Sequence, residues 1–125
     1  MTRFRWMFAG FALFVVAVIV SADTGWADWL LEAVHVIPLG DKLCHCIFMG
    51  TLCWLANRSF RSEPVTAAIP WLTWPTVIIS TLVVAEEFSQ IWIPGRTFSL
   101  ADLAADGLGI AVAVWLTCPR PLSVA

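Results

Sequence analysis

The sequence predicts an all-α membrane protein: a bundle of four transmembrane helices, with a short amphipathic helix at the interface after the first. Hydrophobic residues make up 60% of the 125 residues and charged residues only 13%, about half of the roughly 25% that is usual in a soluble domain. The apolar residues also fall into four runs. A chain of this length forms one domain, so residues 1–125 are expected to form a single membrane domain.

The four runs predict transmembrane segments at about residues 6–22, 42–57, 65–86 and 100–118. A spanning helix needs about 17–25 residues to cross a hydrocarbon core of roughly 30 Å. The first and third runs reach this length with apolar residues alone. The second and fourth reach it only if polar residues at their beginnings are included. Those polar beginnings therefore need a further explanation.

The first run also has features of a secretory signal peptide. Arg3 and Arg5 precede it, and the small residues Ser21 and Ala22 end it. The apolar region of a signal peptide is about 7–15 residues long, which is shorter than this run. We expect the helix to be retained, and cleavage of residues 1–22 stays open as the alternative.

Lysine and arginine predict the orientation, because they favour cytoplasmic loops. With the N-terminus inside, only Lys42 and Arg96 lie outside. The basic residues on the inner side are then Arg3, Arg5, Arg58, Arg61 and Arg120. The sequence therefore predicts a multi-pass protein of the cytoplasmic membrane with both termini in the cytoplasm.

The segment after the first run is expected to form an amphipathic helix at the outer interface. Its apolar residues recur at helical spacing: Trp26, Trp29, Leu30, Ala33 and Val34. Because tryptophan is enriched at membrane interfaces, anchoring is the simplest role for this helix.

The cysteine pattern and the net charge exclude several kinds of partner. The four cysteines contain no CxxC pair, and Cys46 and Cys53 are too far apart along one helix for a disulfide. We expect no metal site and no cofactor. A formal net charge of −2 gives no reason to expect a nucleic-acid partner.

Three polar segments meet the outer membrane boundary in this topology: residues 41–45, 86–90 and 102–106. Asp41 and His45 are four residues apart and share a helix face. Ionisable groups in or beside apolar runs are costly, and by default they suggest function. We expect Asp41 and His45 to face Glu87 and Arg96 across the contact between the second and third helices.

The connection between the third and fourth helices also has a clear pattern. Pro94 and Gly95 are expected to end the third helix, and Arg96 to pair with one carboxylate and hold the turn. Ser99 and Asp102 have the spacing of a helix N-cap. Capping alone would explain Asp102 equally well, and Lys42 has the simpler role of reaching the lipid headgroups.

The motifs DKLCH and EFSQIWIPGRTFSLADLAADGLGI resemble the VanZ-like family. The pattern of that family is Asp-Lys-x-x-His, then Glu-x-x-Gln and a Pro-Gly-Arg turn, then an Asp, an Asn four residues later and a Gly. The resemblance covers residues 41–110. The matching positions are Asp41, Lys42, His45, Glu87, Gln90, Arg96, Asp102 and Gly109. Asp106 stands where the family has Asn, which adds a carboxyl group to the site.

The resemblance implies a small bacterial protein of the inner membrane and the cell envelope. The founding member of the family is associated with low-level resistance to the glycopeptide teicoplanin, and the family implies no settled catalytic mechanism. We therefore predict a polar site at the extracytoplasmic boundary that binds an amphiphilic or cell-envelope ligand. A non-enzymatic protein, with the lipid bilayer as its other partner, is favoured over an enzyme.

Two alternatives stay open. The first is an intramembrane hydrolase, with Glu87 as the general base on a water and His45 as its partner or as an oxyanion stabiliser. The double glutamate resembles the glutamate-type CAAX proteases, but Ile91 stands where they have Arg. The second is a purely structural polar cluster, since polar contacts between membrane helices contribute only about 0.6 kcal/mol on average.

The charge of the site bears on all three functions. Three basic residues, Lys42, His45 and Arg96, meet five acids: Asp41, Glu86, Glu87, Asp102 and Asp106. This excess must be balanced by protons, by a cation or by an amine of the ligand.

Overall fold

The computed structural model describes residues 2–26, 28–60 and 63–118. The secondary structure of this part is helical, apart from an isolated β-bridge between Pro64 and Thr73. The elements are α1 (Thr2–Asp23), α2 (Asp28–His35), α3 (Gly40–Ser59), α4 (Trp74–Ser89), the 3-10 turn η1 (Gln90–Trp92) and α5 (Leu100–Thr117). The prediction of an all-α fold is confirmed, and a short helix follows the first long one as expected.

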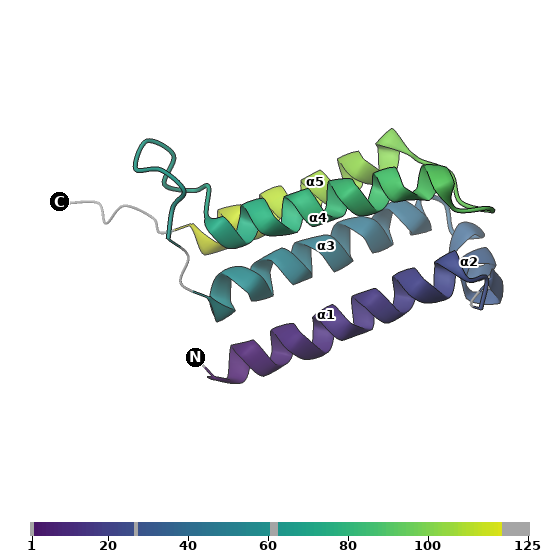
Figure 1. Ribbon diagram of the computed structural model, residues 1–125, viewed down its shortest axis with the longest axis horizontal. Helices are drawn as coiled ribbons and strands as arrows, with labels where there is room; N and C mark the ends of the chain where they lie inside the picture. Colours follow the sequence, from purple (N-terminus) through teal and green to yellow (C-terminus); the bar gives the residue numbers. More distant parts are fainter. Residues whose placement is uncertain (1, 27, 61–62, 119–125) are drawn as a thin grey trace.

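The long helices run side by side along the length of the molecule (Figure 1). α3 packs most extensively against α5 and also contacts α1 and α4, while α4 contacts α5. The start of α1, the connection between α3 and α4 and the end of α5 lie together at one end of the molecule. α2 and the connection between α4 and α5 lie at the other end, which we call the outer end. Arg61 and Arg120, two of the five residues assigned to the inner side, lie outside the described residues.

The third predicted segment begins later than the sequence suggested. Helix α4 starts at Trp74, and residues 65–73 form a loop in which Val65 N–H donates to the Leu72 carbonyl at 2.8 Å. Pro70 disfavours helix in this loop, because it has no N–H donor. Thr73 then caps α4, accepting from the Thr76 N–H, and Pro75 lies in the first turn, where a proline costs little. Residues 65–73 are mostly apolar, so hydropathy assigned them to the predicted helix despite these boundary signals.

The crossing of α3 and α5 brings two backbones into direct contact. A Cβ atom at Gly50 would lie 2.9 Å from the Gly109 carbonyl oxygen, and one at Gly109 would overlap the Cys46 carbonyl. Small residues at such a crossing let two helices approach closely. This contact fixes the register of α3 against α5, and it brings His45 and Asp106 to the same level.

Helix α1 joins the bundle through α3. At the inner end Arg5 Nε donates to the Ser59 carbonyl at 3.2 Å, and Ser59 Oγ donates to the Phe4 carbonyl at 2.8 Å. Farther along, the rings of Phe11 and Phe48 meet edge to face. The core shared by the four long helices consists of Val15, Met49, Cys53, Ala56, Ile79, Val83, Ile110 and Ala113.

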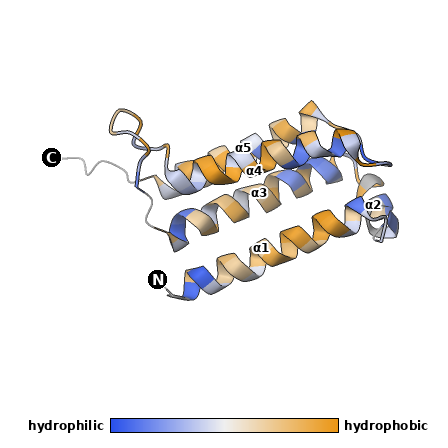
Figure 2. Cartoon of the chain, viewed as in Figure 1, coloured by the Kyte–Doolittle hydropathy of each residue, from blue (hydrophilic) through white to orange (hydrophobic). Residues whose placement is uncertain are grey.

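The length and composition of the described helices support two membrane spans rather than four. Arg3–Asp23 and Leu100–Thr117 are long and apolar enough to cross a membrane. Helix α3 has polar residues at both ends, and α4 has only 16 residues. By length and apolar composition, neither of these two helices therefore qualifies as a membrane span. The apolar surface is nevertheless broad along the bundle (Figure 2), with exposed side chains such as Leu13, Ile47, Ile78 and Trp115.

Candidate functional site at the outer end

The first part of the site is a set of ion pairs between α3 and α5. Lys42 Nζ lies 2.8 Å from Asp41 Oδ2 and also forms an ion pair with Asp102. His45 Nδ1 lies 3.1 Å from Asp106 Oδ1, and its other ring nitrogen lies 3.8 Å from Asp41 Oδ1. Asp106 is only 2% exposed. The start of α3 is therefore joined to the start of α5 by two separate polar contacts.

The second part of the site is Glu87, which is completely buried at the end of α4. Its Oε1 accepts a hydrogen bond of 2.7 Å from the Ser99 N–H, and its Oε2 accepts one of 3.2 Å from the Gln90 amide. The same amide donates to Glu86 at 3.1 Å. Glu87 thus joins α4 to the residue that begins α5.

The α4–α5 connection contains the turn and the helix cap that Pro94, Gly95 and Ser99 predicted. Gly95 adopts a left-handed backbone conformation with φ of 84°, which favours glycine. Ser99 is the N-cap of α5, and its Oγ accepts from the Asp102 N–H at 3.2 Å. The predicted turn and cap are confirmed.

The structure brings the three predicted polar segments together, but with different partners. Asp41 pairs with Lys42 and His45 with Asp106, whereas the sequence predicted that both would face Glu87 and Arg96. His45 and Glu87 do have donor atoms within 4.8 Å of each other, and Arg96 lines the same cavity as Asp41 and His45. The close α3–α5 crossing accounts for the additional partners, because it brings the start of α5 to the outer end of α3.

Arg96 is the predicted site residue that lies apart from the central cluster. Its Nε is 3.5 Å from Asp23 Oδ1, so it joins the α4–α5 turn to the end of α1. A carboxylate partner was expected for Arg96, but Asp23 was identified from the sequence only as the boundary of the first apolar run. The position of Asp23 at the outer end of its helix was the signal for this pairing.

A cavity of about 310 Å³ lies beside the cluster. Its polar lining residues are Asp41, His45, Glu86 and Arg96; its apolar ones include Phe14, Val18, Ile19, Phe48 and Met49. Residues of α1 and α3 thus form most of the apolar wall, and the charged groups gather at the outer end. The sequence did not reveal this cavity, because it depends on how α1 packs on α3.

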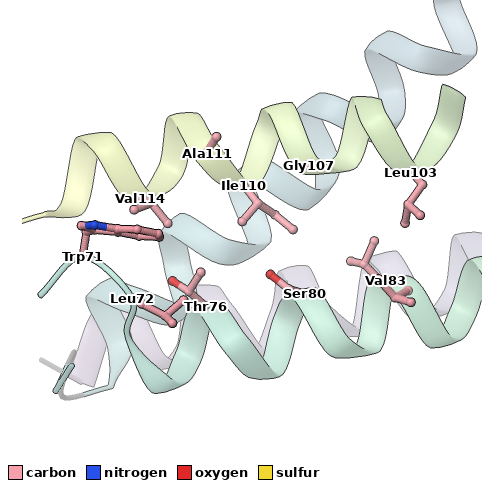
Figure 3. Close-up of a pocket in the computed structure, with 11 residues that line it drawn as sticks. Trp71, Leu72, Thr76, Ser80, Val83, Leu103, Gly107, Ile110, Ala111 and Val114 are labelled. Carbon is pink, nitrogen blue, oxygen red and sulfur yellow. The ribbon is translucent and has the colours of Figure 1, made fainter. Parts of the chain in front are cut away.

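A second cavity, of about 460 Å³, lies between α4 and α5 (Figure 3). Its lining includes Trp71, Val83, Leu103 and Ile110, with the hydroxyls of Thr76 and Ser80. Among the described residues that line it, no side chain is charged, which distinguishes it from the first cavity.

A second polar network, which the sequence analysis did not single out, lies at the inner end. Asn57 Nδ2 donates to Thr76 Oγ1 at 3.0 Å, and Thr73 Oγ1 donates to Asn57 Oδ1 at 2.6 Å. All three side chains are buried. Their neutral, mutually satisfied groups join the end of α3 to the start of α4, which is a structural role.

The comparisons with known proteins give one relative and no family. No family model matches the chain, and no solved structure matches it. The chain is 32% identical over 111 residues to the uncharacterized protein C11E3.10 of Schizosaccharomyces pombe; the match covers 84% of this chain and 60% of that protein. The chain thus spans less than two thirds of the length of that protein. The name of that protein states no function, so the resemblance to the VanZ-like family stays a prediction.

Proposed function

We propose that this chain is a VanZ-like integral membrane protein that binds an amphiphilic ligand from the outer side of the membrane. The observation that carries the proposal is the cavity of about 310 Å³, which is apolar along α1 and α3 and ends at four ionisable side chains. A ligand pocket typically combines an apolar lining with a few convergent polar groups. The apolar tail of the ligand would lie along Val18 and Ile19, and its head group would reach Asp41 and Glu86.

Four membrane-spanning helices are part of this proposal. α3 has 20 residues and would be about 30 Å long, and α4 would be about 24 Å long before η1 extends it. Both helices have exposed apolar residues, such as Ile47 and Ile78, and large exposed apolar surfaces indicate contact with a membrane or a partner. The polar ends of α3 and α5 would then lie at the extracytoplasmic boundary of a cytoplasmic (inner) membrane.

The charge of the cavity favours a ligand with an amine in its head group. Asp41 and Glu86 both line the cavity, and the cavity-lining Arg96 is already paired with Asp23. A protonated amine would supply positive charge to the Glu86 carboxylate in surroundings where unbalanced charge is costly, whereas Asp41 already forms an ion pair with Lys42.

Native mass spectrometry of the full chain, released from micelles, tests the proposal with dodecylamine and dodecanol as probes. We expect dodecylamine to bind at one molecule per chain and more tightly than dodecanol. Ala22→Trp, which fills the cavity, should abolish this binding. Ala111→Trp, which fills the α4–α5 cavity, is the matched control and should leave it intact. Equal binding of both probes, or equal effects of the two variants, would refute the proposal.

The link to glycopeptide resistance rests on the family resemblance alone. A strain that lacks the gene should become more susceptible to teicoplanin, and the parent gene should restore the resistance. The relative comes from a fungus and is uncharacterized, so it adds no support for a glycopeptide as the ligand. Unchanged susceptibility would therefore remove teicoplanin from the proposal without affecting amphiphile binding.

The two alternatives are less well supported by the same site. For hydrolysis, Glu87 would have to activate a water, but both of its carboxylate oxygens already accept hydrogen bonds and the side chain is fully buried. For a purely structural cluster, no cavity would be needed beside it. If Glu86→Gln, which neutralises a carboxylate that lines the cavity, leaves a folded, inserted protein that no longer binds dodecylamine, the structural alternative is excluded.

A further inference from the structure

We propose that His45, Glu87 and Asp106 form a binding site for a divalent transition-metal ion, with Zn²⁺ as the best-matched ion. Imidazole nitrogen and carboxylate oxygen are both ligands of Zn²⁺, and the imidazole favours a transition-metal ion over Mg²⁺ or Ca²⁺. The proposal is independent of amphiphile binding, and it departs from the sequence-based expectation of no metal site. No local motif predicts it, because each ligand comes from a different helix.

The geometry of the three side chains is close to what a metal ion needs. One donor atom from each residue lies within 4.8 Å of the other two. Donors around a tetrahedral Zn²⁺, at about 2.0–2.1 Å from the ion, lie about 3.4 Å apart. Small rotations of the side chains would therefore bring all three donors to coordination distance without a change in the backbone.

The charge balance around Glu87 is a second, separate observation. Glu87 is 0% exposed and Asp106 is 2% exposed. The hydrogen-bond donors to Glu87 are the neutral Ser99 N–H and Gln90 amide. Within the described ranges, Glu87 has no Lys, Arg or His nitrogen within ion-pair distance. Two buried carboxylates thus share His45 as the nearest basic group, and a divalent cation between them would balance both charges.

The surroundings of the site would orient the ligands. One ring nitrogen of His45 points to Asp106, and the other lies 3.8 Å from Asp41. A carboxylate on the far side of an imidazole is the usual second-shell partner of a metal-bound histidine. The Ser99 N–H and the Gln90 amide, which donate hydrogen bonds to Glu87, would likewise fix the orientation of its carboxylate. His45 also lines the cavity of about 310 Å³, so one of the three ligands borders that cavity.

A second group of possible ligands shares His45 but fits less well. Asp41 and Asp102 also lie within reach of His45, but both carboxylates are already in ion pairs with Lys42. A metal ion there would compete with the Lys42 ammonium. The site with Glu87 and Asp106 is therefore the one that we propose.

The test uses the full chain in detergent after treatment with a chelator. The protein is titrated with Co²⁺, with binding measured by the visible absorption of the ion, and separately with Zn²⁺, with binding measured by calorimetry. We expect one ion per chain, with absorption typical of four-coordinate Co²⁺. His45→Ala and Asp106→Asn should each weaken binding at least tenfold. Asp106→Asn is decisive, because an amide can keep a hydrogen bond to His45 and so preserve the fold. Circular dichroism should confirm that each variant is folded.

Two control variants make the result specific. Glu32→Gln removes an exposed carboxylate of α2 and should leave affinity unchanged. Asp102→Asn changes a possible ligand of the second group but none of the proposed site. It should therefore lower the affinity for metal less than Asp106→Asn does. The proposal is overturned if the parent binds no more metal than a denatured sample. It is also overturned if binding survives Asp106→Asn or is lost in Asp102→Asn instead.

Discussion

Among single residues, Glu87 and Asp106 are both buried carboxylates, but they have different hydrogen-bond partners. Glu87 accepts hydrogen bonds from two donors that belong to the α4–α5 connection. The contact of Asp106 is with His45 across the α3–α5 interface. Removing an acceptor from a buried donor costs about 1–3 kcal/mol, whereas an amide in place of Asp106 still offers a carbonyl acceptor. The two residues should therefore differ sharply in their tolerance to substitution.

We predict that Glu87→Ala destabilises the protein by about 1–3 kcal/mol through the stranded Ser99 N–H alone, and that Asp106→Asn costs less than about 1 kcal/mol. Equilibrium unfolding in mixed micelles measures both variants against the parent, and expression and membrane insertion should follow the same order. An equal loss for Asp106→Asn would mean that folding itself requires the charge of Asp106.

Arg96→Ala should have a small effect on stability. Arg96 and Asp23 are partly exposed, and their closest atoms are 3.5 Å apart; a pair of this kind contributes about 0.2–1 kcal/mol. We expect Asp23→Asn to cost about the same, and the double variant to cost no more than either single one. A much larger effect of Arg96→Ala than of Asp23→Asn would show that Arg96 has another partner in the site.

At the scale of elements, the crossing of α3 and α5 decides which polar residues meet. The backbones touch at Gly50 and Gly109, and the polar contacts of His45 and Lys42 lie towards the outer end of the same two helices. Any substitution that separates these helices should therefore weaken the ion pairs as well as the packing.

Two glycines of α5 provide a matched test of this crossing. Gly109→Ala should destabilise the protein by about 1–3 kcal/mol, because its methyl group would meet the Cys46 carbonyl. Gly107→Ala should be neutral or stabilising by up to about 1 kcal/mol, since nothing lies within 4 Å of its Cβ position. Thermal unfolding in one detergent compares the two. Equal effects would contradict the close approach of α3 and α5.

The elements also show what could be predicted from the sequence. Hydropathy located α1, α3 and α5 to within a few residues, and local motifs predicted the Pro94–Gly95 turn and the Ser99 cap. The start of α4 was missed, because Pro70 and Thr73 are weak signals inside an apolar run. The pairing of Asp106 with His45 could not be predicted, since it depends on the contact of Gly109 with α3. The cavity could not be predicted either, because side-chain packing between α1 and α3 creates it.

At the scale of the whole molecule, one end of the bundle carries the site and the other carries described basic residues. Arg5 contacts Ser59 at the inner end, where Arg58 also ends α3. The ion pairs of Lys42, His45 and Arg96 all lie at the outer end. Which end faces the cytoplasm stays a prediction from the rule that basic loops stay in the cytoplasm.

Labelling of intact cells or spheroplasts with an impermeant maleimide tests the orientation. Thr97→Cys, in the exposed α4–α5 turn, should be labelled from outside. Glu63→Cys, in the exposed α3–α4 loop, should be labelled only after the membrane is opened. The parent chain serves as the control for labelling of its own four cysteines. Labelling of the Glu63→Cys variant from outside would reverse the topology and place the site on the cytoplasmic side.

Photocrosslinking of a diazirine-bearing alkylamine to the full chain in lipid nanodiscs, mapped by mass spectrometry, shows directly where an amphiphile binds. We predict crosslinks concentrated on the cavity residues Val18, Ile19 and Phe48. Unlabelled dodecylamine should compete with them, and Ala22→Trp should abolish them. Crosslinks spread evenly over the exposed apolar faces of α1, α4 and α5, without competition and unchanged in that variant, would contradict this prediction.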